Sequence, residues 1–448
     1  LYKNSRYDGH PILWNYLIHL VTGFSSHPIA MQLLHVCISA AVVFVFLRKA
    51  PFSLGLKIAF LLSYFMLYEY TIIARNYNLG ILFVFISCTY YAKRKECFTT
   101  LCLFLAISCN THSIFTILSS ALLLSIFFEQ IIEHKRLIFK IYWKGYVIFL
   151  LGFIIAYIQI IPASDSVFFK NIDYSNTYEI AKSSMSLFKA LFPIVDFTSL
   201  NYWNHFFFIE HFRILSLIVG LIVWVVPLLL FNKNRYVLIF VYTTIIAFVL
   251  FTIITQRHGV RYNGLIFISF IIGLWMMHSQ KQELVFKVIP IKFNNAIIIT
   301  LMTIQVIAGL LAYTLDIKHT FNNGEKVALF LKKNSIEINK TVTLCESASV
   351  NAYLDKSLYN LCYQKPQGYY LWNESCRLFF NNSDEDIILS AFSQKPNDKI
   401  LYIILSTRLK NEQLLEIKNK TYSILFLEKF EEAVKDNYYI YSIEKINE

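Results

Sequence analysis

The sequence predicts a polytopic α-helical membrane protein that carries a small α/β domain at its C-terminal end. Hydrophobic residues make up 56% of the 448 residues and charged residues only 16%, whereas charged residues form about a quarter of an ordinary soluble domain. Apolar stretches recur between residues 28 and 315, and charges become frequent only from Asp316 onward. We therefore expect a multi-spanning membrane domain over residues 1–315 and a second domain over residues 316–448.

The net charge of +12 comes from 41 Lys and Arg residues against 29 acidic residues. A basic protein can bind nucleic acid, but here the basic residues form short clusters between apolar stretches, which is typical of cytoplasmic loops. We expect membrane lipid as a partner and no nucleic acid. The sequence begins at Leu1 inside a polar stretch, and we expect further residues to precede it.

Residues 12–23 are apolar, but they are fewer than the roughly 20 residues that a helix needs to cross the bilayer. Asn15, His19 and Thr22 fall on one face of this segment, which predicts a helix lying in the membrane interface. The expected membrane-spanning helices number about ten, at residues 28–47, 54–69, 77–92, 97–109, 113–128, 145–162, 213–231, 236–254, 263–278 and 294–315.

Alternate loops carry the positive charge, and the positive-inside rule places these loops in the cytoplasm. Their basic residues are Arg48, Lys49 and Lys57; Lys93, Arg94 and Lys95; Lys135, Arg136, Lys140 and Lys144; Lys233 and Arg235; and Lys281, Lys287 and Lys292. The C-terminal domain and the remaining loops, at residues 1–27, 70–76, 163–212 and 255–262, are then extracytoplasmic. We expect an integral protein of a bacterial cytoplasmic membrane.

Residues 97–128 admit two interpretations, because they could form one long helix or two short ones. One helix would put the basic loop at residues 129–144 outside and would leave Asn110, Thr111 and His112 near the middle of the bilayer. We expect two short spans that are joined by a turn at these three residues.

From Asp316 onward, helix-like and strand-like stretches alternate, which favours an α/β domain. In an extracytoplasmic domain a disulfide is permitted, and Cys362 with Cys376 is the candidate pair, whose bonding the sequence leaves open. No His/Cys spacing in the sequence points to a metal site. The expected helix is 324–334, and the expected strands are 341–345, 399–406, 422–428 and 438–444.

Ionisable side chains gather in the loops that the charge rule places outside. Such groups suit transfer from a membrane-borne phosphate ester, because Arg binds phosphate through two N–H donors and a carboxylate can deprotonate an incoming hydroxyl. Arginine at a helix end also reaches lipid phosphates without a catalytic role, which is the alternative for each residue alone. The candidates are Asp8, His10, Glu69, Arg75, His112, Arg257, His258 and Arg261.

Three segments that contain these residues resemble the family 39 glycosyltransferases, which are multi-spanning GT-C enzymes. RYDGHPILWNYLIHL resembles the D-x-HPPLYY segment of the family, and ARNYNLGILFVFISCTYYAKRK is similar to its ARxYALLLLLxxLSLYLLLR segment, which also ends on a basic loop. RHGVRYNGLIFISFIIGLW resembles the late RYxxPxxPxLxLLxA span, without its proline. The resemblance covers about residues 6–278 through degenerate motifs, so it indicates a superfamily better than an activity.

The resemblance implies transfer of a sugar from a polyprenyl-phosphate donor to a lipid, glycan or protein acceptor on the extracytoplasmic face. The anomeric carbon would be inverted, and the lipid-phosphate sugar is a substrate, so no cofactor is implied. In the family the carboxylate that is credited as the base lies upstream of the HPPLYY segment, which here would be before Leu1. Asp8 is therefore carried over as a residue that lines the site.

The expected roles follow from the matched positions. Arg75 matches the arginine of the ARxYALL segment, and Arg261 with Tyr262 matches the RY of the late span. Glu69 would orient Arg75 or the acceptor. We expect Asp8 and Glu69 as catalytic residues; Arg75, Arg257, His258 and Arg261 as ligands of the donor phosphate; and His10, His112 and Tyr262 as substrate-lining residues.

The predicted outside loop at 163–212 contains a second interfacial element. If residues 177–192 form one helix, its apolar and polar side chains separate onto two faces. The aromatic run at 201–208 is favoured at the depth of lipid headgroups. We interpret the loop either as a lid over the lipid substrate or as an ordinary interfacial anchor. The apolar face would hold Ile180, Leu187, Phe188 and Leu191, and the polar face Lys182, Ser186 and Lys189.

Other function classes share parts of this pattern. Ion-coupled transporters usually place ionisable residues inside the bilayer, whereas the span interiors here offer chiefly Gln32, His35, Asn78, Gln159 and Gln305. A polymerase or ligase of lipid-linked glycans would use similar chemistry outside the membrane, and a non-enzymatic scaffold is a further alternative. Consumption of a polyprenyl-phosphate monosaccharide as donor separates the transferase from a transporter, a flippase and a ligase.

Overall fold

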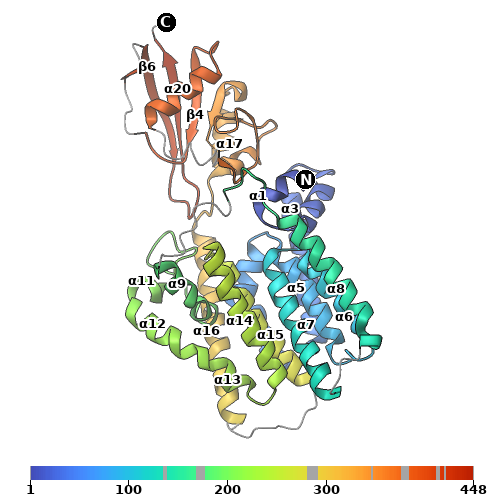
Figure 1. Cartoon of the computed structure of the whole chain (residues 1–448). Helices are drawn as coiled ribbons and strands as arrows, with labels where there is room; N and C mark the ends of the chain where they lie inside the picture. The colour runs from blue at the N-terminus through green and yellow to red at the C-terminus, as the bar shows by residue number, and fades with distance from the viewer. Residues whose placement is uncertain are drawn as a thin grey trace. The chain divides into compact units, whose positions relative to one another are not determined.

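The structure is a computed structural model, and it describes residues 2–134, 139–167, 177–279, 291–344, 347–374, 383–409, 414–417 and 420–446. The chain divides into two compact units (Figure 1). The first comprises Leu1–Gly23, Met31–Ile161 and Asn171–Leu315, and it is helical. The second comprises Phe24–Ala30, Pro162–Lys170 and Asp316–Glu448, and it contains the β-sheet.

Among the described residues, seven helical segments are long and apolar enough to cross a membrane. They belong to α3 (Ile29–Lys49), α7 (Ser113–His134), α8 (Phe139–Ile160), the run of α12 (Arg213–Ile222), η2 (Val223–Val225) and α13 (Val226–Phe231), α14 (Arg235–Thr255), α15 (Val260–Ser279) and α16 (Ile291–Lys318). The chain is therefore a polytopic helical membrane protein. The other three segments expected to span form shorter helices: α4 (Leu54–Leu61) with η1 (Tyr64–Ile72), α5 (Tyr77–Tyr91) and α6 (Phe98–Cys109).

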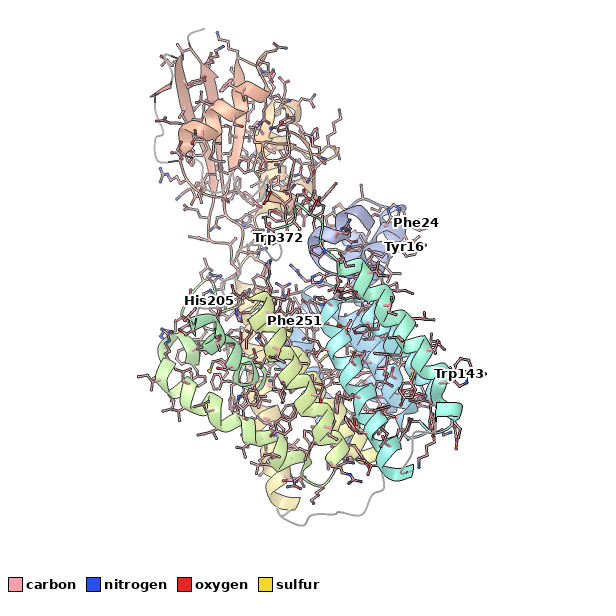
Figure 2. The ribbon with its side chains drawn as sticks, in the orientation of Figure 1. Tyr16, Phe24, Trp143, His205, Phe251 and Trp372 are labelled. Atoms are coloured by element: carbon pink, nitrogen blue, oxygen red, sulfur yellow. The ribbon has the colours of Figure 1, made fainter. Side chains whose placement is uncertain are left out.

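The side chains of α15 form the interior of the helical unit, because nearly all of them from Asn263 to Met276 are buried. A helix that is apolar on every side is typical of a position surrounded by other helices. α15 packs against α5, α7, α14 and α10 (Ser186–Leu191). In contrast, Trp143 on α8 projects outward and is 43% exposed (Figure 2), as expected for a helix that faces lipid.

The prediction of two helices over residues 97–128 is confirmed. α6 ends at Cys109, Asn110 follows as its C-cap, and α7 begins at Ser113. Asn110 explains the break, because its side-chain amide donates to the carbonyl groups of Ala106 and Gly152, both at 2.9 Å. The turn places His112 at the end of the helices that flank it.

The segment after α4 forms a π-helix, η1, rather than a continuous α-helix. The chain breaks at Ser63, whose hydroxyl donates to the carbonyl of Phe60 at 2.6 Å. Gly309 on α16 permits this geometry, since a Cβ there would collide with the backbone of Leu62 and Ser63. π-helical turns are rare and are frequent at functional sites. This one carries Glu69.

Short helices connect the longer ones: α1 (Tyr2–Asp8), α2 (Leu13–Thr22), α9 (Thr177–Ser184) and α11 (Phe207–His211). The prediction of a single amphipathic helix over residues 177–192 is wrong. The helix breaks at Met185, and every side chain of α10 is buried, including those of Ser186 and Lys189. The polar face is lost because α10 packs between α15 and α12.

The second unit is an α/β domain with a mixed seven-stranded sheet of order β3-β2-β1-β4-β7-β6-β5. β1 runs parallel to β2 and β4, and the other neighbours are antiparallel. The strands are β1 (Thr341–Thr343), β2 (Tyr359–Asn360), β3 (Lys365–Pro366), β4 (Ile400–Leu405), β5 (Leu414–Ile417), β6 (Lys420–Phe430) and β7 (Tyr438–Lys445). The helices are α17 (Gly324–Lys333), η3 (Ile338–Lys340), α18 (Ala348–Asn351) and α20 (Asp384–Gln394).

Apolar side chains cover both faces of this sheet. On β4, Ile403 packs in the core beneath α20, and the next residue, Ile404, packs in the core beneath α17. β7 alternates in the same way through Tyr441 and Ile440, as the period of two in a strand requires. The expected helix and all four expected strands are present in this domain, whereas Cys376 lies outside the described residues.

A buried ion pair provides a test of the helical packing. Arg94 Nε donates to Glu129 Oε2 at 2.7 Å, a second bond joins the same two groups, and the side chains are 12% and 3% exposed. Arg94→Met removes the guanidinium partner of the Glu129 carboxylate and should lower the free energy of unfolding by about 3 kcal/mol. Denaturant unfolding in detergent micelles measures this change.

The exposed neighbour Lys93 provides the matched control. Lys93→Met should leave the free energy of unfolding within about 0.5 kcal/mol of the unaltered value. The double variant with Arg94→Met and Glu129→Met should recover most of the loss, since neither charge is then buried alone. Equal effects of Arg94→Met and Lys93→Met on the free energy of unfolding would contradict the assignment of Arg94 and Glu129 as a buried ion pair.

Candidate functional site

Two arginines from distant parts of the chain lie close together in the helical unit. Arg75 follows η1, and Arg261 is the second residue of α15. Partial removal of water, and then the positive charge of Arg261, lower the pKa of the Arg75 guanidinium. The Arg75 side chain nevertheless remains exposed, and among the described residues it makes no hydrogen bond or ion pair. Its N–H donors are therefore available to an anion.

Arg261 is held in place by aromatic contacts rather than by a carboxylate bond. Its guanidinium carbon lies 4.9 Å from the ring centroid of Trp203, a distance at which a cation is attracted to the aromatic face. Its backbone carbonyl accepts a hydrogen bond of 2.7 Å from the hydroxyl of Tyr70. Its Nη1 atom is buried without a hydrogen-bond partner among the described residues. A buried donor of this kind can bond to an acceptor on a ligand.

Gly264 makes the position of Tyr70 possible. It lies on α15, three residues after Arg261, and a Cβ at this position would collide with the hydroxyl of Tyr70 and the ring of Phe65. The π-helix and α15 can therefore approach closely only at a glycine. The contact fixes the start of α15 relative to η1, and so it fixes Arg261 relative to Glu69.

Glu69 is buried beside the two arginines, with only 2% of its surface exposed. Tyr64 donates to its Oε1 atom at 2.8 Å, and Arg261, Arg75 and Trp203 are its other polar neighbours. No ion pair within 4.0 Å joins this carboxylate to either arginine among the described residues. One carboxylate thus faces two guanidinium groups, and the cluster retains a net positive charge.

Two histidines and three tyrosines pack together beside the arginines. The ring centroids of His10 and His112 are 3.9 Å apart, and Tyr77 lies 4.6 Å from His112 on the next step of the stack. Tyr262 packs on His112 at 5.7 Å, and Tyr70 stacks on Tyr77 at 5.4 Å. The stack joins the N-terminal segment, the turn after α6 and the start of α15.

Both histidines are uncharged at neutral pH. Burial, and then the charges of Arg75, Arg261 and Arg257, lower the pKa of His10 to about 4. Burial, and then the neighbouring His10 and the charges of Arg261 and Arg75, hold the pKa of His112 well below its usual value. His112 Nδ1 accepts the backbone N–H of Ile114 at 3.1 Å, so Nε2 carries the proton. That Nε2 atom has no partner among the described residues, which makes it a second orphaned donor in the cluster.

Asp8 interacts with Asn15 rather than with the arginines of this cluster. The side chain of Asn15 hydrogen-bonds to its carboxyl group, and burial raises its pKa to about 6. Neither Arg75 nor Arg261 is among the groups that shift its pKa. A carboxyl group with a pKa near neutrality suits proton transfer, and Asp8 is two residues from His10 in the sequence.

The residues of segment 257–261 lie in two different groups, one around His10 and the arginines and the other around Glu179. Arg257 is close enough to lower the pKa of His10, whereas His258 Nε2 lies 2.5 Å from Glu179 Oε2 on α9. Burial, and then the charges of Lys182 and Lys189, lower the pKa of His258. The structure therefore brings Arg75, Arg261, Glu69, His10, His112 and Tyr262 together, and it places His258 in a separate group.

Sequence analysis missed the aromatic residues that hold the cluster. Tyr64 contacts Glu69, and Tyr77 contacts His112. Tyr70 and Trp203 both contact Arg261. The chain contains 29 Tyr and 40 Phe residues, so an aromatic residue beside a charged one carries little information. The YEYTIIARNYN run was the available signal, because it sets three tyrosines around Glu69 and Arg75.

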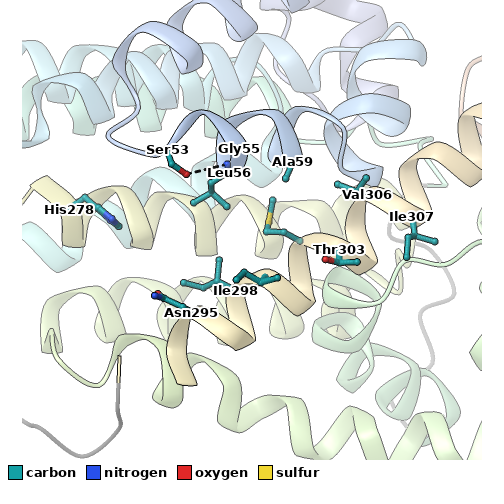
Figure 3. Close-up of a pocket in the computed structure, with 12 residues that line it drawn as sticks. Ser53, Gly55, Leu56, Ala59, His278, Asn295, Ile298, Thr303, Val306 and Ile307 are labelled. Carbon is teal, nitrogen blue, oxygen red and sulfur yellow. Dashed lines mark hydrogen bonds between the residues drawn. The ribbon is translucent and has the colours of Figure 1, made fainter. Parts of the chain in front are cut away.

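A separate groove of about 560 Å³ lies between α4 and α16 (Figure 3). Its walls are mainly apolar, including Leu56, Ala59, Ile298 and Val306, and it contains none of the residues of the arginine cluster. At its edge Ser53 caps α4 by accepting the backbone N–H of Leu56 (Figure 3). Its polar lining residues are Ser53, His278, Asn295 and Thr303, and none of its described lining residues is an arginine, a lysine or a carboxylate, so it is not the candidate site.

Within the described residues no group of three or more His, Cys, Asp or Glu side chains could hold a metal ion. The fold and the cluster define the class of the protein as a polytopic helical membrane protein with a cationic, aromatic site. No model of a known protein family matches the chain, and no curated protein matches it either.

The raised pKa of Asp8 predicts a specific pH dependence. Because the folded pKa of about 6 exceeds the ordinary value of 3.8, the folded chain favours the protonated carboxyl. Unfolding free energy should therefore fall as the pH rises from about 4 to about 6, by up to about 3 kcal/mol. Asp8→Asn removes this loss, so the variant should exceed the unaltered chain in stability at pH 7 and match it near pH 4.

Unfolding of both proteins in detergent across this pH range measures the difference. His10 titrates in the opposite sense, because its folded pKa is lowered and its contribution is lost as the pH falls toward 4. The difference between variant and unaltered chain removes the His10 contribution, which is common to both. A difference that does not change with pH would contradict the burial of the Asp8 carboxyl.

Proposed function

We propose that this chain transfers a sugar from a polyprenyl-phosphate donor to an acceptor on the extracytoplasmic face of the membrane. The observation that carries the proposal is the pair of guanidinium groups at Arg75 and Arg261, which retain N–H donors without partners and have Glu69 as their neighbouring carboxylate among the described residues. Such a pair is costly without an anion, and a phosphate accepts two N–H bonds from each guanidinium. The resemblance of three segments to family 39 glycosyltransferases supports the same substrate class.

The residues around the pair supply the other requirements of the reaction. In the transfer, an acceptor hydroxyl oxygen bonds to the anomeric carbon, the bond from that carbon to the phosphate oxygen breaks, and the lipid phosphate leaves with the electron pair. Arg75 and Arg261 stabilise the charge that develops on the leaving phosphate. A carboxylate takes the hydroxyl proton, and Asp8, with its pKa of about 6, is suited to this step.

Glu69 has a different role in this proposal. Its carboxylate already accepts a hydrogen bond from Tyr64 and lies beside both arginines, so it orients the guanidinium groups. Neutral His10 and His112 offer hydrogen bonds to sugar hydroxyls without adding charge, and the ring of Tyr262 offers an apolar face to a sugar. His258 and Arg257 belong to the surroundings of the donor phosphate.

The proposal includes the topology of the chain. The basic residues at the ends of α3, α5, α8 and α14 favour a cytoplasmic location for those ends. The arginine cluster and the domain from Asp316 onward would then be extracytoplasmic. This arrangement counts about ten spans, because α4 with η1, α5 and α6 cross the membrane as short helices beside the seven long ones.

Removing one guanidinium should impair transfer far more than it impairs folding. Arg261→Ala removes donors to the leaving phosphate, and we expect turnover to fall by about 10²- to 10³-fold. The assay measures release of polyprenyl phosphate from a radiolabelled polyprenyl-phosphate monosaccharide in membranes that contain equal amounts of protein. Arg48→Ala is the control, because Arg48 is exposed in the last turn of α3 and should leave turnover unchanged.

Three outcomes of this assay separate the alternatives. Donor consumption that requires Arg261 supports the transferase. Movement of the intact lipid across the bilayer without consumption indicates a flippase, and reaction only with a lipid-linked oligosaccharide indicates a polymerase or ligase. Equal turnover of Arg261→Ala and the unaltered chain would remove this residue from the site.

Cysteine labelling tests the topology independently of activity. Lys356 and Lys93 are both exposed, and the proposal puts them on opposite sides of the membrane. In intact cells a membrane-impermeant maleimide should label a Lys356→Cys variant above the level of the unaltered chain. It should label Lys93→Cys only after the membrane is permeabilised. Labelling of Lys93→Cys, and not of Lys356→Cys, in intact cells would reverse the topology.

A further inference from the structure

A second basic cluster surrounds a small pocket on the helices before the span at Arg213–Phe231. The pocket has a volume of about 110 Å³ and is lined by side chains of α9, α10, α11 and α12. Its cations are Lys182, Lys189 and Arg213. None of the three forms an ion pair with a carboxylate among the described residues. The cluster is distinct from the pair formed by Arg75 and Arg261.

Lys189 is the central observation. It lies in α10, where every side chain is buried, and only 8% of its own surface is exposed. Its ammonium group makes no hydrogen bond with any described residue, although an ammonium has three donors to satisfy. A cation that has lost most of its contact with water and has no partner is destabilised. Lys189 lines the pocket, so a ligand there can accept hydrogen bonds from its ammonium group.

The nearest carboxylates already have partners. Glu179 and Glu210 are the acidic groups that influence Lys189. Glu179 Oε2 is bonded to His258 Nε2 at 2.5 Å, and Glu210 Oε1 lies 3.4 Å from His205 Nδ1. Three cations therefore face two carboxylates, and both carboxylates are directed to histidines. The pocket retains positive charge.

An aromatic ring organises the other two cations. The ammonium of Lys182 lies 5.9 Å, and the guanidinium carbon of Arg213 lies 5.6 Å, from the ring centroid of Tyr178. Both distances permit attraction between a cation and the aromatic face. The ring thus holds two like charges at one rim of the pocket without neutralising them, so both remain available to a shared anion.

The remaining walls are mainly apolar, with Ser216 as a polar member, and lie at the start of a candidate membrane span. Met185 and Leu217 line the pocket, and Arg213 begins the apolar span that continues through α12 and α13. A compact anion with an attached apolar chain matches this combination of walls, as does the anion alone. Carboxylates are also anions, but convergence of three cations on one small volume favours the higher charge and multiple acceptors of a phosphate.

We propose that Lys182, Lys189 and Arg213 form a second binding site, which takes the phosphate of a phosphate ester. The phosphate can come from the headgroup of an anionic membrane lipid or from a free phosphate compound. In either case Lys189 donates to it from the buried end of the pocket, and Lys182 and Arg213 donate from the rim. Binding at this site does not depend on the sugar transfer proposed for the site at Arg75 and Arg261.

The test measures binding by the full chain purified in detergent. Two probes are titrated: inorganic phosphate, and mixed micelles of phosphatidylglycerol with phosphatidylcholine micelles as the reference. The readout is the change in fluorescence of the chain's own tryptophans, with native mass spectrometry to count bound lipid. We expect saturable binding of at least one probe, and Lys189→Met should weaken it roughly tenfold or more.

A matched control separates loss of the site from loss of the fold. Lys233→Met removes a lysine outside the pocket and should bind as the unaltered chain does. Lys189→Met should remain folded, because it replaces a buried cation with an apolar side chain of similar length. Arg213→Met, at the rim, removes a second ligand without changing the buried core of α10 and should also weaken binding.

Each outcome has one meaning. Binding of phosphatidylglycerol but not of inorganic phosphate, abolished by Lys189→Met, supports the site and identifies a lipid headgroup. Saturable binding of inorganic phosphate with the same dependence supports the site and identifies a free phosphate compound. Equal binding by Lys189→Met and the unaltered chain, or no saturable binding of either probe, overturns the proposal. Because no sugar is transferred in this assay, its failure is distinct from failure of the proposed transferase.

Discussion

The repulsion between Arg75 and Arg261 is the constraint around which the helical unit is organised. Two like charges at close range cost more as water is removed from them, and the pKa of Arg75 is lowered for both reasons. Glu69 offsets part of the repulsion, and the face of Trp203 attracts the Arg261 guanidinium. Neither contact uses up the N–H donors, so the fold preserves an arrangement that an anion would stabilise.

Unusual backbone geometry holds these charges in position. Glu69 lies on a π-helix, and the close approach of α15 to that π-helix depends on Gly264. Tyr70 then bonds to the carbonyl of Arg261, which ties the start of α15 to the segment that precedes Arg75. The N-terminal segment, the turn after α6 and the start of α15 meet here, and among the described residues aromatic rings rather than salt bridges hold them together. Aromatic anchors add packing without neutralising the cations.

Much of the fold follows from the sequence because hydropathy and charge act over whole segments. The seven long spans, the break at Asn110 and the strands of the C-terminal domain have signals that extend over many residues or that depend on local hydrogen bonds. The helix break at Met185 has no such signal. Residues 177–192 have a helical period, but the burial of Ser186 and Lys189 is determined by packing of α10 against α15 and α12, which the local pattern does not encode.

In the candidate site, too, some features could be predicted from the sequence and others could not. Arg75, Arg261, Glu69, His10 and His112 were found because polar residues are conspicuous between apolar spans. The distribution of these residues into clusters was not predictable, since neighbours in the sequence diverge in space. His258 contacts Glu179, whereas Arg261, three residues later, lies over Trp203. Loop residues take their direction from long-range contacts, and one sequence carries no direct record of those contacts.

The loop at residues 257–261 also lies beside both basic clusters, the pair of Arg75 and Arg261 and the group of Lys182, Lys189 and Arg213. The short segment 257–261 contributes Arg257 and Arg261 to the surroundings of His10, and it contributes His258 to the group that contains Lys182 and Lys189. An anion that neutralises Lys182 and Lys189 would weaken the positive field on His258. The protonated imidazole would then be favoured, and its bond to the Glu179 carboxylate would strengthen. Arg261 lies three residues after His258 on the same backbone segment. The two clusters are distinct in their side chains, and one loop contributes residues to both.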